Sequence, residues 1–304
     1  MKANVLFFVA LTIVGCTSRT TSNETTVNDT IATVLNEQTI EVVNSDPKTI
    51  GDIPLPEGFK RVAIEDTTSF AYFLRNLPLK PLGTPVYTYD GNVAWTTDYT
   101  YAVIDAYKPS NEDIQQCADA IIRLRAEWLW KNKRYNEIAF HFTNGWLCEY
   151  TKWADGYRVS IEGNKTSWQK AAAEDYSYEN FQKYLRTVFY YAGTLSLEKE
   201  LEPTTVHAMK IGDVFIKGGS PGHAIIVVDV ANYIGDPNSG LHNDKCFLVA
   251  ESYMPAQDIH ILTNTTMYCE DMSPWHLMLS VYRSGDGYRF PSYTFTPREI
   301  KRFK

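Results

Sequence analysis

The last third of the chain alternates short apolar runs with Gly, Pro and polar turns, a pattern that predicts β-strands. Three runs of strand length lie at residues 213–216, 223–230 and 246–251. The segment 217–222 between the first two is short and rich in Gly, which is typical of a hairpin-like connection. Because consecutive strands usually neighbour each other, we expect all three to be adjacent and antiparallel.

The middle of the chain shows helical spacing instead. Apolar residues at positions 114, 117, 121, 124 and 128 recur every three or four residues and so share one face of a helix. Ser110 opens the sequence Ser-Asn-Glu-Asp, a variant of the capping box, and we expect this helix to begin there. A second helix is predicted over 179–192, where Gly193 ends it.

Shorter patterns predict the remaining elements. They are a short helix capped at 68–69 and running to 74, a hairpin across 86–95, and strands at 101–106, 137–142 and 157–161. Helices and strands are mixed, and the strands cluster late in the chain, which indicates an α+β fold. We expect a mostly antiparallel sheet packed by helices, in a single domain over residues 49–304.

Composition supports one large core and narrows the class of partner. The chain contains 20 Tyr, 14 Phe and 7 Trp among its 304 residues, enough for a core that fits one domain better than two. The net charge is −7 and no basic stripe occurs, so we expect no nucleic-acid partner. No His-x-x-x-His or Cys-x-x-Cys spacing occurs, so we expect neither a metal nor another cofactor.

The first 48 residues differ from the rest. Residues 1–16 combine a basic start, an apolar run from Val5 to Val14 and a final Cys16, as in a signal peptide. The ending Ile13-Val14-Gly15-Cys16 resembles a bacterial lipobox, which implies cleavage before Cys16 and lipid attachment to its thiol. Residues 17–48 are polar and almost free of aromatics, which predicts a disordered tether.

The lipobox resemblance also implies a location. No Asp follows Cys16 at position 17 or 18, so the resemblance implies a lipid anchor in the outer membrane of the bacterial cell envelope. No later apolar run is long enough to span a membrane.

Cys117 and His223 are the candidate catalytic pair, because a thiol and a nearby base are what a cysteine hydrolase needs. Cys117 lies in the predicted helix, and His223 follows the sequence Gly218-Gly219-Ser220-Pro221-Gly222 and opens an apolar strand. The structural alternatives are a core cysteine and a hydrogen-bonded structural histidine.

A third side chain must orient the imidazole. Glu251 ends the neighbouring strand, where its carboxylate either orients His223 or forms an exposed strand end, the interpretation that we favour. Gln257 is the other candidate. Disulfides are a competing use of the thiols, since Cys117, Cys148, Cys246 and Cys269 allow three full pairings, and a Cys246–Cys269 pair would leave Cys117 free.

The segments GDVFI and GHAIIVVDV resemble the second half of NlpC-type papain-like cysteine peptidases, which cut peptide stems in peptidoglycan. The resemblance implies a papain-like core, Cys117 as nucleophile and His223 as base. The chain departs from that family in having Gln116-Cys117-Ala118 in place of Asp-Cys-Ser, and in a separation of about a hundred residues between Cys117 and His223.

A second resemblance covers nearly the whole mature chain. The segments IPLPEGFKRV, QQCADAIIRLRAEWLW, YLRTVFYYAGTLSLEKEL and SYMPAQDIHIL are similar to an uncharacterised family of bacterial lipoproteins, a domain of unknown function. The expected function is that of an envelope lipoprotein that hydrolyses peptidoglycan peptides. The alternative is a non-catalytic lipoprotein that binds glycan or protein through its Tyr and Trp side chains.

Overall fold

The computed structural model describes residues 46–163, 165–241, 244–265, 273–278 and 287–304. These residues belong to one unit, Ser45–Lys304. The expected signal peptide, Cys16, almost all of the tether and Cys269 lie outside the described residues. None of the helices in the described part is long and apolar enough to cross a membrane.

Helices occupy the middle of the chain. The α-helices in the described residues are α1 (Phe70–Arg75), α2 (Cys117–Lys131), α3 (Tyr150–Ala154), α4 (Tyr178–Tyr191) and α5 (Thr194–Glu200). Short 3-10 helices span Ile50–Asp52, Trp95–Tyr99, Tyr135–Glu137 and Val206–Ala208. Helix α1 begins as its sequence predicts, because the Ser69 hydroxyl accepts a hydrogen bond from the Tyr72 N–H at 3.2 Å.

One large sheet organises the fold. Its strands run in the order β2 (Thr100–Val103), β11 (His260–Leu262), β10 (Lys245–Glu251), β9 (His223–Tyr233), β8 (Val214–Lys217), β15 (Ile300–Arg302) and β7 (Glu202–Pro203). Strand β1 (Phe59–Arg61) also pairs with β9, and β12 (His276–Leu277) with β10. Two-stranded sheets pair β3 (Ala139–His141) with β4 (Leu147–Glu149), β5 (Tyr157–Glu162) with β6 (Lys165–Lys170), and β13 (Tyr288–Arg289) with β14 (Thr294–Phe295).

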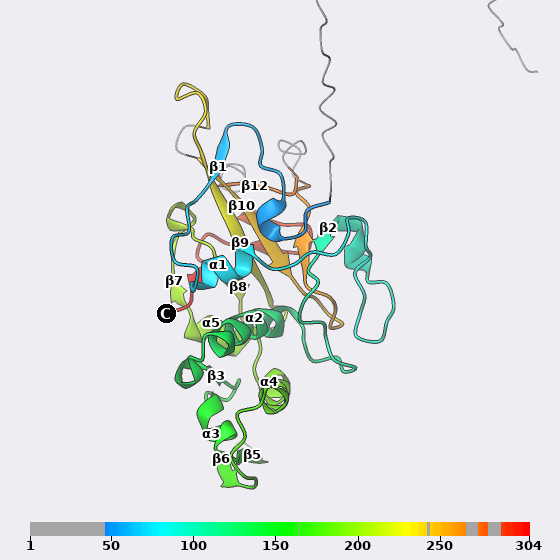
Figure 1. The fold of residues 1–304 in the computed structure, drawn as a ribbon, viewed down its shortest axis with the longest axis vertical. Coiled ribbons are helices and arrows are strands. Elements are labelled where there is room, and N and C mark those ends of the chain that lie inside the picture. Colours follow the sequence, from blue (N-terminus) through cyan, green and yellow to red (C-terminus); the bar gives the residue numbers. More distant parts are fainter. Residues whose placement is uncertain (1–45, 164, 242–243, 266–272, 279–286) are drawn as a thin grey trace, which may run out of the picture. The chain divides into compact units, whose positions relative to one another are not determined.

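The α+β prediction is confirmed. Each strand pair in the described residues is antiparallel, and helices pack against the large sheet. The three strands expected at the end of the chain are β8, β9 and β10, and they are neighbours, as predicted. In Figure 1, β9 and β10 are the long strands of the sheet, and α1 and α2 lie beside them.

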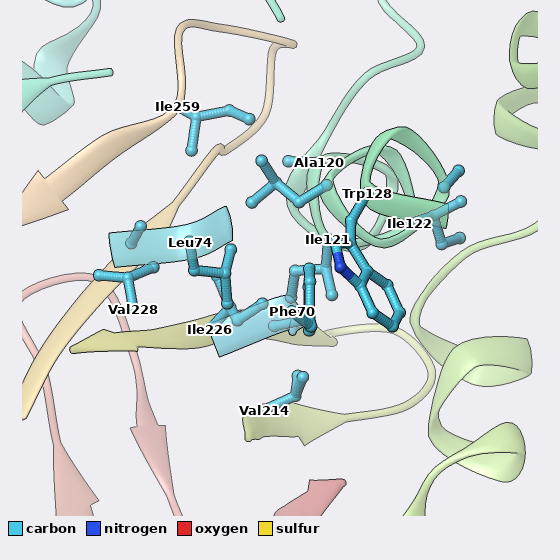
Figure 2. Close-up of a cluster of buried hydrophobic side chains, with 14 of the residues drawn as sticks. Phe70, Leu74, Ala120, Ile121, Ile122, Trp128, Val214, Ile226, Val228 and Ile259 are labelled. Atoms are coloured by element: carbon cyan, nitrogen blue, oxygen red, sulfur yellow. The ribbon is translucent and has the colours of Figure 1, made fainter. Parts of the chain in front are cut away.

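Both faces of β9 are buried, which explains its unbroken apolar sequence. Successive side chains of a strand point to opposite faces of the sheet. Ile226 and Val228 join a core with α1 and α2, and Figure 2 shows them close to Leu74 and Ile121. Ile225 and Val227 join a second core on the opposite face. Each fully buried aliphatic side chain of this kind contributes roughly 1.5–3 kcal/mol by leaving water.

The helix expected from Ser110 begins instead at Cys117, so this boundary was wrong. Residues ahead of it are held in a loop by side chains that bond elsewhere. The Asp113 carboxylate accepts hydrogen bonds from the Ala256 N–H at 2.6 Å and from the Gln116 side chain at 3.0 Å. The Gln115 amide donates to the Tyr107 carbonyl at 2.8 Å. These bonds, of which the one to Ala256 is long-range, compete with a local helix cap.

The hairpin expected at 86–95 is present in short form. Tyr87 and Val93 form an antiparallel bridge, and backbone hydrogen bonds run from Thr88 N–H to Asn92 and from Ala94 N–H to Val86. The Asp90 carboxylate bonds the Thr88 hydroxyl and the Asn92 side chain and so closes a tight turn. Thr88, next to Tyr87, forms an isolated bridge with Gln257, which is far away in sequence. The segment after this turn is a 3-10 helix, Trp95–Tyr99, and not a strand.

Candidate active site

Cys117 is the first residue of α2, which places its thiol at the positive end of the helix dipole. The side chain is only 8% exposed, but it borders an open cleft. Cys117, Cys148 and Cys246 are all free thiols. Because Cys246 is free, the suggested Cys246–Cys269 disulfide is not present.

His223 is the first residue of β9, opposite Lys217 at the end of β8. The turn that joins these strands needs glycine at two points. Gly219 has a φ of +109°, which side chains with a Cβ rarely adopt. A Cβ on Gly222 would lie 2.4 Å from the Gly219 carbonyl oxygen and 2.7 Å from Thr194 Oγ1. The close backbone packing of this turn explains the Gly-rich sequence before His223.

His223 and Glu251 are in direct contact. Nε2 of His223 lies 2.7 Å from Oε2 of Glu251, and both side chains are almost fully buried. A carboxylate can only accept, so Nε2 carries the proton and Nδ1 is the nitrogen left for another partner. The Ser292 hydroxyl donates to the same Glu251 oxygen at 2.6 Å. The imidazole N–H of His223 and the Ser292 hydroxyl therefore bond the same carboxylate oxygen and hold it beside the ring.

Cys117 is the other partner of His223. Burial by itself acts to lower the pKa of His223, but hydrogen bonds to Cys117 and Glu251, and the negative charges of those groups, raise it to about 9. The rings of Tyr253 and Tyr293 lie 4.9 Å and 5.4 Å from the imidazole and hold its plane. The fold therefore brings a thiol, an imidazole and a carboxylate into one chain of contacts.

Glu251 is 1% exposed, so the exposed strand end that we favoured from the sequence was wrong. Burial acts to raise the pKa of this carboxyl, but contacts with His223 and His260 lower it to about 2. The carboxylate is therefore ionised at neutral pH. Its position follows from the register of the sheet, since β10 lies directly beside β9.

Gln257 is not in contact with His223 in the described structure. Its main chain bonds the Ser252 hydroxyl, and its own side chain is fully buried with no hydrogen-bond partner among the described residues. The structure therefore brings together three of the four candidate residues, with Glu251 in the place beside the ring.

A cleft of about 580 Å³ opens beside this group. Its walls combine the start of α2, the Gly-rich turn before β9 and several aromatic side chains. The lining includes Gln116, Cys117, Ala118, Asp119, Phe189, Tyr190, Gly219, Ser220, Pro221, Gly222, His223, Tyr253, Met254 and Tyr293. The cleft is large enough for a few residues of a peptide or a comparable small ligand.

The other described thiols have a different environment. Cys148 and Cys246 are fully buried in the hydrophobic core, where desolvation raises the pKa of each. Neither lines the cleft. Of the described cysteines, Cys117 alone therefore combines an imidazole partner with access to a cleft.

His260 is a further residue beside this group that the sequence analysis did not single out. It lies in β11 directly opposite Glu251, and it is completely buried. Its Nε2 lies 3.6 Å from Oε1 of Glu251. The useful signal was the alternation of apolar residues around it, Ile259 and Ile261, which marks a buried strand. In the described residues no group of three or more His, Cys, Asp or Glu side chains is arranged to hold a metal ion.

Comparison with known proteins gives one match. The family model DUF4846, a domain of unknown function, matches residues 51–302. No curated protein and no solved structure matches the chain. The match spans almost the whole described unit, and it confirms the predicted membership in a family defined by a domain of unknown function.

Proposed function

The chain belongs to the DUF4846 family, and we propose that it is a thiol-dependent hydrolase with Cys117 as nucleophile, His223 as base and Glu251 as the orienting carboxylate. The observation that carries this proposal is the chain of contacts from Cys117 through His223 to Glu251 at the edge of a cleft. A nucleophile bonded to a base, which is itself oriented by a third group, is the arrangement of nucleophilic catalysis.

The first half of the reaction acylates the thiol. The Cys117 S–H proton moves to Nδ1 of His223, and the thiolate attacks the carbonyl carbon of the substrate. An S–C bond forms, and the carbonyl oxygen becomes an oxyanion. When the C–N or C–O bond of the substrate breaks, His223 returns the proton to the leaving group. Glu251 stabilises the imidazolium that exists between these two steps.

The second half removes the acyl group. His223 takes a proton from water, and the hydroxide attacks the thioester carbon. The C–S bond then breaks, a carboxylic acid leaves, and Cys117 regains its proton from His223. In both halves the oxyanion would lie beside the first N–H groups of α2, which have no carbonyl partner inside the helix. Cys117 and Ala118, the first two residues of α2, both line the cleft.

The expected substrates are peptides of the peptidoglycan stem. The aromatic walls of the cleft suit contact with an extended peptide chain. The order of elements, with a thiol at a helix start and an imidazole that opens a strand, also supports the resemblance to papain-like peptidases. We further propose that the protein is a lipid-anchored lipoprotein of the bacterial outer membrane.

Thiol labelling tests the nucleophile without a known substrate. We expect iodoacetamide at pH 7 to label Cys117 much faster than Cys148 or Cys246. His223→Ala should slow Cys117 labelling at least about tenfold, because a thiol with an ordinary pKa near 8.5 is only a few per cent ionised at pH 7. The measurement is labelling rate by peptide mass mapping.

His141→Ala is the matched control, because His141 is partly exposed and does not line the cleft. It should leave the rate at Cys117 unchanged. Equal labelling rates at Cys117 in the wild type and in His223→Ala would overturn the assignment of the catalytic pair.

The anchor has its own test. We expect Cys16→Ser to move the protein from the membrane fraction to the soluble fraction, because the thiol that would carry the lipid is gone and buried acyl chains supply the membrane affinity. Fractionation of cells followed by immunoblotting measures the distribution. Cys269→Ser is the control and should stay with the membrane, whereas unchanged membrane association of Cys16→Ser would contradict the lipid anchor.

A further inference from the structure

Glu251 lies between two imidazoles, and only one of them has a role in the proposed reaction. Oε2 of Glu251 faces His223 at 2.7 Å, and Oε1 faces Nε2 of His260 at 3.6 Å. His260 and Glu251 are direct cross-strand neighbours in β11 and β10. His260 has no exposed surface, so it cannot be a surface residue of the cleft.

Both ring nitrogens of His260 face acceptors. Nδ1 lies 3.0 Å from the backbone carbonyl oxygen of Asp258, which can only accept. Nε2 faces the Glu251 carboxylate, which also only accepts. The Asp258 contact requires a proton on Nδ1. Nε2 and Oε1 of Glu251 lie too far apart for a hydrogen bond and have no other hydrogen-bond partner among the described residues, so only a proton on Nε2 would make their proximity attractive.

Other charged groups around His260 are either paired or neutral. The Asp258 carboxylate is bound by Lys80 Nζ at 2.8 Å. Tyr99, whose ring centroid lies 6.3 Å from that of His260, has its pKa raised by burial and then by the charge of Glu251, so its phenol stays protonated. Val103, the partner of His260 in β2, is apolar. Of these groups, only the Glu251 carboxylate directs its charge at His260.

With a proton on both nitrogens of His260, the charges of the buried Cys117, His223, Glu251 and His260 side chains sum to zero. Without His260, a Cys117 thiolate, a His223 imidazolium and a Glu251 carboxylate would leave one net negative charge in a desolvated site, which is costly. The same deficit would exist before proton transfer, with Glu251 as the unbalanced charge. A cationic His260 balances the group in both states.

We infer that His260 is a positioning residue, which holds the second oxygen of Glu251 and supplies the positive charge that balances the buried Cys117–His223–Glu251 group. This inference rests on the proposed function. His260 does not touch the substrate and acts on Cys117 only through Glu251 and His223. Loss of its charge and loss of its contact both disfavour the Cys117 thiolate.

The test is the pH profile of Cys117 alkylation by iodoacetamide, measured in the full chain by peptide mapping. We expect His260→Leu to move the acid limb of the profile to higher pH by about one unit, which is about a tenfold lower rate at pH 6. The pH profile reports the coupled titration of the Cys117–His223–Glu251 group, and its midpoint is not the pKa of one residue. His260→Gln, which keeps a neutral donor to Glu251, should lie between the two.

His276→Leu is the matched control, because His276 is also a fully buried histidine of the large sheet, and burial lowers its pKa to about 3, so it carries no charge at neutral pH. It should leave the profile unchanged. Thermal unfolding of each variant verifies that it is folded. A profile of folded His260→Gln or His260→Leu identical to that of the wild type would overturn the inference. If wild-type Cys117 reacts no faster than in His223→Ala, it is instead the proposed hydrolase function that fails.

Discussion

Replacing Cys117 by alanine is expected to reduce hydrolysis by a factor of at least about 10³, because the nucleophile of a covalent mechanism cannot be replaced by its neighbours. The assay is a panel of peptides released from peptidoglycan, with cleavage read by mass spectrometry. Substrate binding should persist, since a methyl group leaves the cleft open. The loss should therefore appear in kcat and not in KM.

Cys246→Ala is the control for the loss of a thiol. Cys246 is buried in the core and lies outside the cleft, so its removal should leave kcat near the wild-type value. A Cys117→Ala variant that still cleaves peptides at the wild-type rate would show that the activity does not use this thiol. In that case the cleft would belong to the alternative function, a non-catalytic site for glycan or peptide.

Glu251→Gln is expected to destabilise the protein by about 3–5 kcal/mol near pH 6, because removal of one partner from a buried pair leaves the other charge uncompensated. The side chain of Glu251 has no exposed surface, so solvent does not screen the loss. Urea unfolding, compared between the variant and the wild type, measures the difference. Glu179→Gln is the control, since Glu179 forms an exposed pair with Lys183 that should contribute less than about 1 kcal/mol.

The destabilisation by Glu251→Gln should depend on pH in a defined direction. Protonated His223 has a raised pKa, so its contribution is complete below about pH 6.5 and disappears as the pH rises through about 9. Ionised Glu251 has a lowered pKa, so its contribution is complete above about pH 4.5 and disappears as the pH falls toward about 2. The difference between the wild type and the variant should be largest between pH 4.5 and 6.5. A difference that is constant from pH 3 to pH 9 would contradict the ion pair.

Local patterns in the sequence predicted most of the elements that carry the site. The apolar runs at 213–216, 223–230 and 246–251 correspond to β8, β9 and β10, and their adjacency followed from their consecutive order along the chain. Helix α4 was predicted within one residue at each end. These elements depend on periodicity and turn residues, which are properties of a few consecutive positions.

Boundaries and partners that depend on distant residues were not predictable in the same way. The start of α2 moved from Ser110 to Cys117 because Asp113 bonds Ala256, which is far away in the chain. Glu251 was expected at the surface, but it is buried, and Ser292, on a loop near the end of the chain, donates a hydrogen bond to its carboxylate. Gln257, the other candidate, has a buried side chain with no hydrogen-bond partner among the described residues.

The sequence by itself determined the α+β class, the three central strands, the family and the identity of the pair Cys117 and His223 as the residues to examine. Only the tertiary structure decided that the two side chains meet, that Glu251 and not Gln257 lies beside the imidazole, and that His260 lies behind the carboxylate. The physical reason is the separation along the chain of the residues that each effect involves. Hydrophobic periodicity acts between neighbours along the chain, whereas the burial and pairing of a charge depend on strand register and on loops contributed by distant segments.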